Sequence, residues 1–256
     1  KEWTPRNGSK ARYGEMVTLK WGLAQSNNWI SAWLMNQLSP AALVRLIHEF
    51  GILNMDIHPS LALCLGPCDI SVAEMVGAYT AFARKGVRRY PLYVTRIEDS
   101  NGDVVAEFTP RVREVISEDA ACKMVTLMRG VIDSGTGHRM RARYHLTVPM
   151  AGKTGTTNDN SDGWFVGYTP SLSFGGWVGG EERDIHFASM AIGQGANAAL
   201  PISAYFLMKV FADKSLGYSQ EEDFDIPEGF DPCGQTDESE TEEEIAVEPV
   251  LDNLAN

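Results

Sequence analysis

Residues 153–156 read Lys-Thr-Gly-Thr, and they are the most informative short segment of the 256-residue chain. Extended, β-branched residues precede them in Thr147-Val148-Pro149, and the turn-forming residues of Thr157-Asn158-Asp159-Asn160 follow. The segment is therefore expected to end a strand. A cation and two hydroxyl groups on one extended segment can bind a carboxylate beside a sheet edge. The pattern indicates a substrate-binding strand.

A phosphate-binding loop is the first competing interpretation, because Gly152-Lys153-Thr154 matches the second half of the pattern G-x-x-x-x-G-K-[ST]. That pattern requires a glycine at position 147, where the chain has Thr147. Val148 and Pro149 lie between and favour extended backbone over a phosphate-cradling loop. The sequence therefore argues against a phosphate loop.

A second polar motif, Ser26-Asn27-Asn28, follows an expected helix over Leu19 to Gln25 that Thr18 can cap. A turn between two helices can present the Ser26 hydroxyl and the Asn28 carboxamide to one cleft. Such a triplet on its own is more often a polar turn. Its meaning depends on the motif at Lys153.

Together the two motifs resemble the serine penicillin-binding proteins, whose signature is Ser-x-x-Lys, then Ser-Asp-Asn, then Lys-Thr-Gly. Ser26-Asn27-Asn28 corresponds to the second motif with Asn in the middle, and Lys153-Thr154-Gly155 corresponds to the third. The resemblance covers most of residues 1–214 and is nearest to the bifunctional class A type. Further segments that carry it are residues 3–7, 16–19, 74–83, 135–137 and 163–168.

The first motif of that signature is absent, because no serine in the chain is followed by a lysine three residues later. In the family, this motif precedes the second by several tens of residues, whereas twenty-five residues precede Ser26 here. The sequence is therefore expected to be the C-terminal portion of a transpeptidase domain, without its nucleophile. On this interpretation the chain alone is inactive, and the missing N-terminal part of the same protein is a partner.

The resemblance also implies roles for the site residues and for the protein. Lys153 and Ser26 join a proton relay, Asn28 donates its amide to the substrate backbone, and Thr154 and Thr156 hold a terminal carboxylate. The expected catalytic set is thus Ser26, Asn28, Lys153 and Thr156, and the expected substrate-binding set is Thr154, Gly155, Thr156 and Thr157. The substrates would be D-alanyl-D-alanine stem peptides of peptidoglycan, with β-lactams as further ligands. The implied location is extracytoplasmic, at the periplasmic face of the membrane, and no cofactor is expected.

Two alternative functions remain open at this stage. A serine β-lactamase would hydrolyse the same kind of acyl intermediate. A noncatalytic module would keep a groove for stem peptides or for a protein partner.

The net charge of −12 is unevenly distributed. Residues 215–256 contain fourteen acidic residues and no Lys or Arg, whereas residues 1–214 contain twenty acidic and twenty-two basic residues. Such an acidic segment buries too little apolar surface to offset its ordering entropy. We therefore expect a folded domain at residues 1–214 and a disordered tail at residues 215–256. The charge pattern suggests no nucleic-acid binding.

The four cysteines and five histidines show no spacing typical of a metal site, and no metal is expected. Cys64 and Cys68 could form a bridge, but free buried thiols are the simpler interpretation. Cys122 and Cys233 have no cysteine nearby in the sequence. The chain also has no run of about 18 apolar residues that would predict a membrane span.

The order of expected elements is helices first and a sheet last. Caps and glycines predict helices over 40–50, 71–85, 117–134 and 200–214, and Asn101-Gly102 predicts a hairpin of 94–97 with 104–108. Strands are expected at 148–156, 164–168, 172–178 and 186–192, and short connections make them antiparallel. The fold class is therefore α+β, β-lactamase/transpeptidase-like: a helical lobe packed on an antiparallel sheet, with the N-terminal strands and nucleophile helix missing.

Three finer expectations concern packing. Ile202, Phe206 and Val210 should cover the sheet from the last helix. The set Trp21, Trp29 and Trp33 should belong to the core, since large apolar side chains dominate helix packing. Residues 193–197 should form a flexible loop beside the cleft.

Overall fold

The computed structural model describes residues 3–8 and 12–232. The chain forms two compact units, residues 1–226 and residues 227–256. Only residues 227–232 of the second unit are described. Of the segment 215–256 that was expected to be disordered, residues 215–232 are thus described, whereas Cys233 and the acidic residues from Glu238 to Glu244 lie outside the described residues. All elements named below belong to the first unit.

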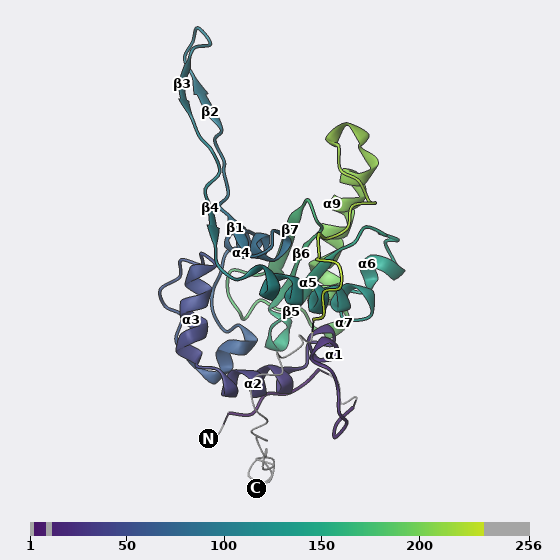
Figure 1. The fold of residues 1–256 in the computed structure, drawn as a ribbon. Helices are drawn as coiled ribbons and strands as arrows, with labels where there is room; N and C mark the ends of the chain where they lie inside the picture. The colour runs from purple at the N-terminus through teal and green to yellow at the C-terminus, as the bar shows by residue number, and fades with distance from the viewer. Residues whose placement is uncertain (1–2, 9–11, 233–256) are drawn as a thin grey trace. The chain divides into compact units, whose positions relative to one another are not determined.

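Along the chain, helices both precede and follow the three strands of the main sheet (Figure 1). The α-helices are α1 (Leu19–Ala24), α2 (Asn28–Gln37), α3 (Pro40–Glu49), α4 (Val72–Ala83), α5 (Glu118–Asp133), α6 (Arg139–Ala142), α7 (Met190–Gly193), α8 (Gly195–Ala198) and α9 (Leu200–Ala212). Three 3₁₀ helices are η1 (Leu61–Leu65), η2 (Asn158–Asn160) and η3 (Lys214–Leu216).

The strands form three antiparallel groups. Their bounds are β1 (Val87–Arg89), β2 (Arg96–Glu98), β3 (Val104–Glu107), β4 (Val112–Glu114), β5 (Ala151–Thr156), β6 (Asp162–Tyr168) and β7 (Ser173–Gly179). The main sheet has the order β5-β6-β7, β1 pairs with β4, and β2 pairs with β3. The structure is therefore α+β with an antiparallel sheet, as the sequence predicts.

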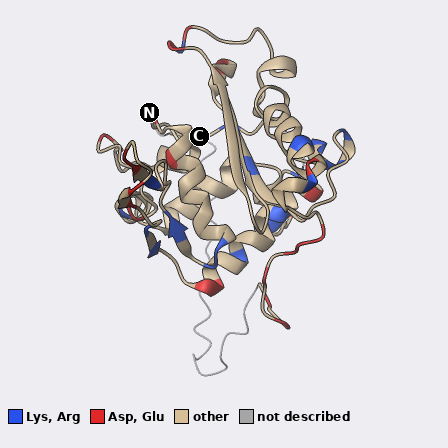
Figure 2. Ribbon diagram, turned by 90° about the horizontal axis from the view of Figure 1, so that it is seen from above, with Lys and Arg blue, Asp and Glu red and all other residues tan. Residues whose placement is uncertain are grey.

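Helices cover both faces of the main sheet. Two neighbouring glycines of β7 show this, because a Cβ at Gly175 would lie 2.9 Å from a methyl of Val76 on α4, whereas a Cβ at Gly176 would lie 3.8 Å from Cβ of Ile202 on α9. Successive residues of a strand point to opposite faces, so α4 and α9 lie on opposite sides of the sheet. Charged residues are concentrated on loops and helix ends rather than on these packed elements (Figure 2).

The predicted helix starts are confirmed, because local capping chemistry fixes them. The Thr18 hydroxyl accepts from the backbone N–H of Trp21 at the start of α1. Ser71 and Glu74 form the expected capping box of α4, and the Ser117 side chain caps α5. Each cap satisfies a backbone donor that the first helical turn leaves unpaired.

The predicted hairpin is also confirmed, and it extends away from the body of the first unit (Figure 1). Its turn is longer than the two-residue turn that Asn101-Gly102 suggests. Only Gly102 has a positive φ angle, at 90°, and Asp99 accepts from the backbone N–H groups of Asn101 and Asp103. The side chain of Asp99 thus organises a five-residue turn.

The chain after α9 returns to pack against α5 and against the residues that follow α4. Asp223 pairs with Arg129 of α5 at 3.1 Å, and Asp225 pairs with Lys85 at 2.6 Å. Between them, the Phe224 ring meets the Tyr168 ring with 5.6 Å between centroids. The compact unit accordingly runs to Ile226, twelve residues beyond the expected boundary at 214.

The predicted inward face of α9 is only partly right, since Ile202 lies over Gly176 of β7 but Phe206 does not join the core cluster. Ile202 and Phe206 are about half exposed, at 52% and 47%, although Val210 is buried. The core face consists of residues spaced by three and four positions, namely Leu200, Ala204, Leu207 and Phe211. Because α9 is apolar on nearly all sides, its hydrophobic pattern could not select the inward face.

The predicted strand at 186–192 is wrong as well. Its second half forms α7, and the backbone N–H of Phe187 donates to the carbonyl of Asn160 at 3.3 Å instead of joining β7. The expected flexible loop at 193–197 is helical, since it ends α7 and forms α8.

The tryptophans of α2 do not join the core. Trp29 is 43% exposed and Trp33 is 56% exposed. The Trp29 indole donates to the Pro5 carbonyl at 3.0 Å and stacks edge-on against Tyr13. It covers the N-terminal segment rather than the sheet.

Cys64, Cys68 and Cys122 are free thiols. Burial raises the pKa of all three. In the described part of the chain, no cluster of three His, Cys, Asp or Glu side chains could hold a metal ion. None of the helices formed by the described residues has the length and hydropathy that crossing a bilayer requires.

Candidate active site

Strand β5 places the Lys-Thr-Gly-Thr segment at the edge of the main sheet. It pairs with β6 in the register Lys153 opposite Val166 and Thr156 opposite Gly163. On its other side it has no strand neighbour among the described residues. An exposed strand edge can pair with an extended peptide through backbone hydrogen bonds.

The side chains of Lys153 and Ser26 meet, although 127 residues separate them in the sequence. Lys153 Nζ donates to Ser26 Oγ at 2.7 Å and to the Thr154 carbonyl at 2.8 Å. The sequence predicted that the two motifs share one site, and this contact brings the cation of one beside the hydroxyl of the other.

Ser26 owes its position to the tight turn between α1 and α2. Its φ angle is +53°, which is uncommon for a residue with a Cβ and is typical of functional turns. The turn is closed by the Asn27 N–H, which donates to the Gly22 carbonyl at 2.9 Å. The Asn27 side chain then caps α2. The middle residue of the motif thus has a structural role, and the serine is left free to face Lys153.

Burial lowers the pKa of Lys153 from 10.5 to about 8. The cause is loss of solvation, which disfavours the charged ammonium. A lysine with a pKa near 8 is neutral in about one molecule in ten at pH 7 and can act as a general base. The proton on Ser26 or on a neighbouring hydroxyl lies within its reach.

The structure engages Asn28 differently from the expectation. Its side-chain amide donates to the Arg6 carbonyl at 2.6 Å, and its backbone N–H donates to the Asn7 side chain at 2.7 Å. Asn28 therefore ties the N-terminal segment to α2. One of its two amide hydrogens is used in this way, which leaves the second for a further acceptor.

The threonines of the segment fall into two environments. Thr154 is buried, and its hydroxyl shares a 2.6 Å hydrogen bond with that of Thr136. Thr156 is exposed, and its hydroxyl oxygen accepts from the Gly195 N–H at 2.9 Å. Because the oxygen of Thr156 is the acceptor, its hydrogen stays available for an anionic ligand. Thr156 is the better placed of the two to bind a carboxylate.

Gly155 and Thr157 complete the predicted set. A Cβ at Gly155 would lie 3.0 Å from Cβ of Trp164, so a small residue is favoured there. The Thr157 hydroxyl is 2.8 Å from that of Ser161, and it accepts from the Asp162 N–H at 2.8 Å. Thr157 thus stabilises the turn after β5, while its neighbour Thr156 faces the exposed side.

Thr136 and Gly195 help to position the site, although the sequence analysis assigned no role to either residue. Thr136 links the end of α1 to β5. Its N–H donates to the Ala24 carbonyl, and its hydroxyl is hydrogen-bonded to the hydroxyl of Thr154. Gly195 brings its N–H to Thr156, and a Cβ there would lie 2.2 Å from the Gly155 carbonyl oxygen. The signals were present as Gly135-Thr136-Gly137 and Gly193-Gln194-Gly195, where glycines permit close backbone approach.

Comparison with known proteins shows the family of this chain. Residues 1–174 match the family model of the penicillin binding protein transpeptidase domain. Penicillin-binding protein 1A of Aquifex aeolicus is 31% identical over 226 residues, which is 88% of this chain and 29% of that protein. Penicillin-binding protein 1A of Neisseria meningitidis is 31% identical over 206 residues, 78% of this chain and 25% of that protein.

Solved structures show the same fold. Penicillin-binding protein 1A from Haemophilus influenzae superposes with a TM-score of 0.74 at 23% identity, over 83% of this chain and 37% of that one. The PonA1 protein from Mycobacterium tuberculosis, solved in complex with penicillin V, gives a TM-score of 0.69 at 25% identity, over 85% of this chain and 61% of that one.

The fold and the lysine–serine site thus define a transpeptidase-like domain. The chain belongs to the penicillin-binding protein transpeptidase domain family, of the class A type. It spans less than a third of the length of the two curated relatives named above.

Proposed function

We propose that this chain forms the substrate-binding and proton-transfer part of a peptidoglycan D,D-transpeptidase. The reaction joins D-alanyl-D-alanine stem peptides through an acyl-serine, and β-lactams acylate the same serine. One observation carries the proposal: the 2.7 Å contact between Lys153 and Ser26 beside the edge of β5 that has no strand partner among the described residues. The lowered pKa of Lys153 supports it, because proton transfer at neutral pH needs such a group.

The chemistry takes place in two steps. The serine oxygen attacks the carbonyl carbon of the penultimate D-alanine, the C–N bond breaks, and the terminal D-alanine leaves with the serine proton on its amine. An amine of a second stem peptide then attacks the ester, which forms the cross-linking amide and returns a proton to the serine. In the proposed scheme, Lys153 and Ser26 relay these protons.

The substrate would lie along β5. The Thr156 hydroxyl would donate to the terminal carboxylate, and the Lys153 ammonium would add positive potential. The Thr156 backbone N–H would provide one donor to the oxyanion that forms on the attacked carbonyl. The second amide hydrogen of Asn28 would bind a substrate carbonyl, while Thr154 and Gly155 would shape the strand beneath it.

The nucleophilic serine is proposed to come from residues outside these 256, because none of their serines is followed by a lysine at the third position. A longer polypeptide containing this chain would then be the enzyme. Its site of action would be extracytoplasmic, where stem peptides are cross-linked.

A labelled penicillin tests the proposal on two polypeptides: this chain, and a longer one that also contains Ser-x-x-Lys. The longer polypeptide should be labelled covalently and this chain should not. In the longer polypeptide, Lys153→Ala should slow labelling by about 100-fold, the lower range for loss of a general base. Arg96→Ala on the distant hairpin is the matched loss of a cation and should leave labelling unchanged. Labelling of this chain, or normal labelling of the Lys153 variant, would contradict the proposal.

A further inference from the structure

The Asp162 carboxylate is half-buried at the start of β6, and both of its oxygens accept hydrogen bonds. Its Oδ1 accepts from the indole Nε1–H of Trp177 on β7 at 2.8 Å. Its Oδ2 lies 3.1 Å from the hydroxyl oxygen of Thr157, directly after β5, and 3.2 Å from that of Ser161. This side chain of the central strand therefore links the end of β5 to β7.

The hydroxyls of Thr157 and Ser161 close a small network with this carboxylate. The two hydroxyl oxygens lie 2.8 Å apart, and Thr157 Oγ1 also accepts from the Asp162 N–H at 2.8 Å. An ionised carboxylate only accepts, so the two hydroxyl hydrogens serve the three oxygen–oxygen contacts of the network. Neither hydroxyl then has a hydrogen left for a substrate, and the adjacent Thr156 is the residue that can donate one.

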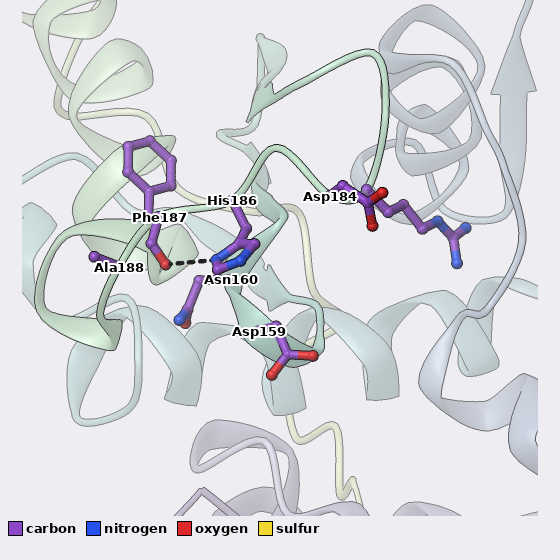
Figure 3. Close-up of a pocket in the computed structure, with 7 residues that line it drawn as sticks. Asp159, Asn160, Asp184, His186, Phe187 and Ala188 are labelled. Atoms are coloured by element: carbon purple, nitrogen blue, oxygen red, sulfur yellow. Dashed lines mark hydrogen bonds between the residues drawn. The ribbon is translucent and has the colours of Figure 1, made fainter.

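The turn from Thr157 to Asp162 is strained and is held by hydrogen bonds on two sides. Asp159 and Asn160 within it have φ angles of +58° and +60°, in the left-handed region that residues with a Cβ rarely adopt. One side of the turn borders an open hollow of about 550 Å³, where the Asn160 carbonyl accepts from the Phe187 N–H at 3.3 Å (Figure 3). On the side of the sheet, the carboxylate network supplies the anchor.

The same end of the sheet fixes Thr156. Thr156 pairs with Gly163, the residue after Asp162, and its hydroxyl oxygen accepts from the Gly195 N–H at 2.9 Å. Gly163 packs against the same segment, because a Cβ there would lie 3.3 Å from Cβ of Ala198 and 3.4 Å from Cα of Gly195. A shift of Asp162 would therefore move both the strand partner of Thr156 and the N–H that orients its hydroxyl.

We propose that Asp162 is a positioning residue for carboxylate recognition, because it fixes the end of β5 so that the Thr156 hydroxyl faces the ligand. The inference rests on the proposed function for the role of Thr156 and for the ligand, a stem peptide or penicillin that carries a carboxylate. A direct contact of Asp162 with that carboxylate is unfavourable, since both groups are negative. Asp162 therefore acts through Thr156.

Penicillin and its methyl ester separate this role from a general loss of structure. Both compounds carry the reactive lactam ring, and only penicillin has a free carboxylate. In the longer polypeptide that contains Ser-x-x-Lys, Asp162→Ala should slow labelling by penicillin about tenfold and leave labelling by the ester within about twofold, because only the free carboxylate makes a charge-assisted hydrogen bond. Equal slowing with the two compounds would overturn the proposal.

A double-mutant cycle tests whether Asp162 acts through Thr156. Thr156→Val removes the hydroxyl and should slow penicillin labelling about 30-fold, as expected for the loss of one hydrogen bond to a charged group. Asp162→Ala in that background should have no further effect, because the hydroxyl that it positions is gone. Independent losses, in which the two factors multiply, would contradict an action through Thr156.

Two further variants separate position from charge. Asp162→Asn keeps an acceptor for Trp177 and can donate an amide hydrogen to a hydroxyl, so its penicillin labelling should stay within about threefold of the unsubstituted polypeptide. An Asp162→Asn variant as slow as Asp162→Ala would show that the charge matters rather than the position, and the proposal would fail. Glu182→Ala is the matched loss of an exposed carboxylate after β7 and should change neither labelling rate.

A measurement on this chain does not depend on acylation. In ¹H–¹⁵N spectra, Asp162→Ala should shift the Trp177 indole signal and the Gly195 amide signal, which reports the hydrogen bond to Thr156, and Asp162→Asn should shift both signals less. An unmoved Gly195 signal in both variants would overturn the positioning role. Failure of penicillin to label the longer polypeptide, with the Gly195 shift retained, would instead overturn the proposed function and leave the link between Asp162 and Thr156 standing.

Discussion

The main sheet and the β2–β3 hairpin are both antiparallel and both predictable from sequence, yet they are held in opposite ways. Phe165 and Tyr168 of β6 are fully buried between helices on the two faces of the sheet. On the hairpin segment, Tyr93 is 83% exposed and Val105 is 66% exposed. Strand pairing alone leaves a ribbon open to solvent, whereas packing on both faces fixes the side chains of β5 in place.

The difference explains where the candidate site lies. Ser26, Thr136 and Gly195 come from three separate segments and each contacts β5. These contacts fix the positions of the reactive groups relative to β5, and catalysis depends on such positioning. The hairpin has no such support and contributes no residue to the site.

Gly195→Ala should give the largest loss of stability. Its Cβ would lie 2.2 Å from the Gly155 carbonyl oxygen and 2.4 Å from that of Trp164, so backbone must move. We expect a loss of about 3 kcal/mol in the free energy of unfolding, measured with urea. Gly102→Ala on the hairpin is the control: it meets no atom within 4 Å and should lose about 1 kcal/mol through its positive φ angle. Equal losses would remove the contrast between the two regions.

Lys153 should make stability depend on pH in an identifiable window. Its pKa is about 8 in the folded chain and 10.5 as an unperturbed lysine, so between these values the unfolded state binds more protons. The free energy of unfolding should then rise with pH across this window. Subtracting the curve of Lys153→Met should leave an increase of about 3 kcal/mol between pH 7.5 and 10.5. A flat difference would show that the lysine is fully solvated.

Thr136→Val should destabilise the sheet moderately. It removes the 2.6 Å hydrogen bond and leaves the buried Thr154 hydroxyl without that partner. We expect a loss of about 1–2 kcal/mol in thermal or urea unfolding. The double variant with Thr154→Val should recover part of this loss, because both polar groups are then gone. Strictly additive losses would mean that the two hydroxyls do not interact.

Phe108→Ser on the hairpin should have the smallest effect, below about 0.5 kcal/mol, since the side chain is already 44% exposed. A loss above 1 kcal/mol in the free energy of unfolding would show that the Phe108 side chain makes a buried contact.

The parts of the structure that local chemistry decides can be predicted from the sequence. Thr18, Ser71 and Ser117 begin helices because their side chains satisfy nearby backbone donors. The pairing of Lys153 with Ser26 was also predictable, through the family resemblance of the two motifs.

Tertiary contacts decided the rest, and no local pattern reveals them. The buried face of α9 is the one whose residues, Ala204 among them, join the core cluster, and the 186–192 segment depends on the hydrogen bond from the Phe187 N–H to the Asn160 carbonyl. Trp29 lies against the N-terminal segment instead of the core. The contact from Gly195 to Thr156 likewise joins residues 39 positions apart.

Burial beside Ser26 prepares Lys153 for proton transfer. The direct measurement is the pKa of its ε-amine, from an NMR titration of ¹³C-labelled lysine with Lys153→Arg to assign the signal. The structure predicts a pKa of about 8 for Lys153, below the ordinary value of 10.5, because burial disfavours the charged ammonium. A titration midpoint at or above the ordinary 10.5 would contradict the account.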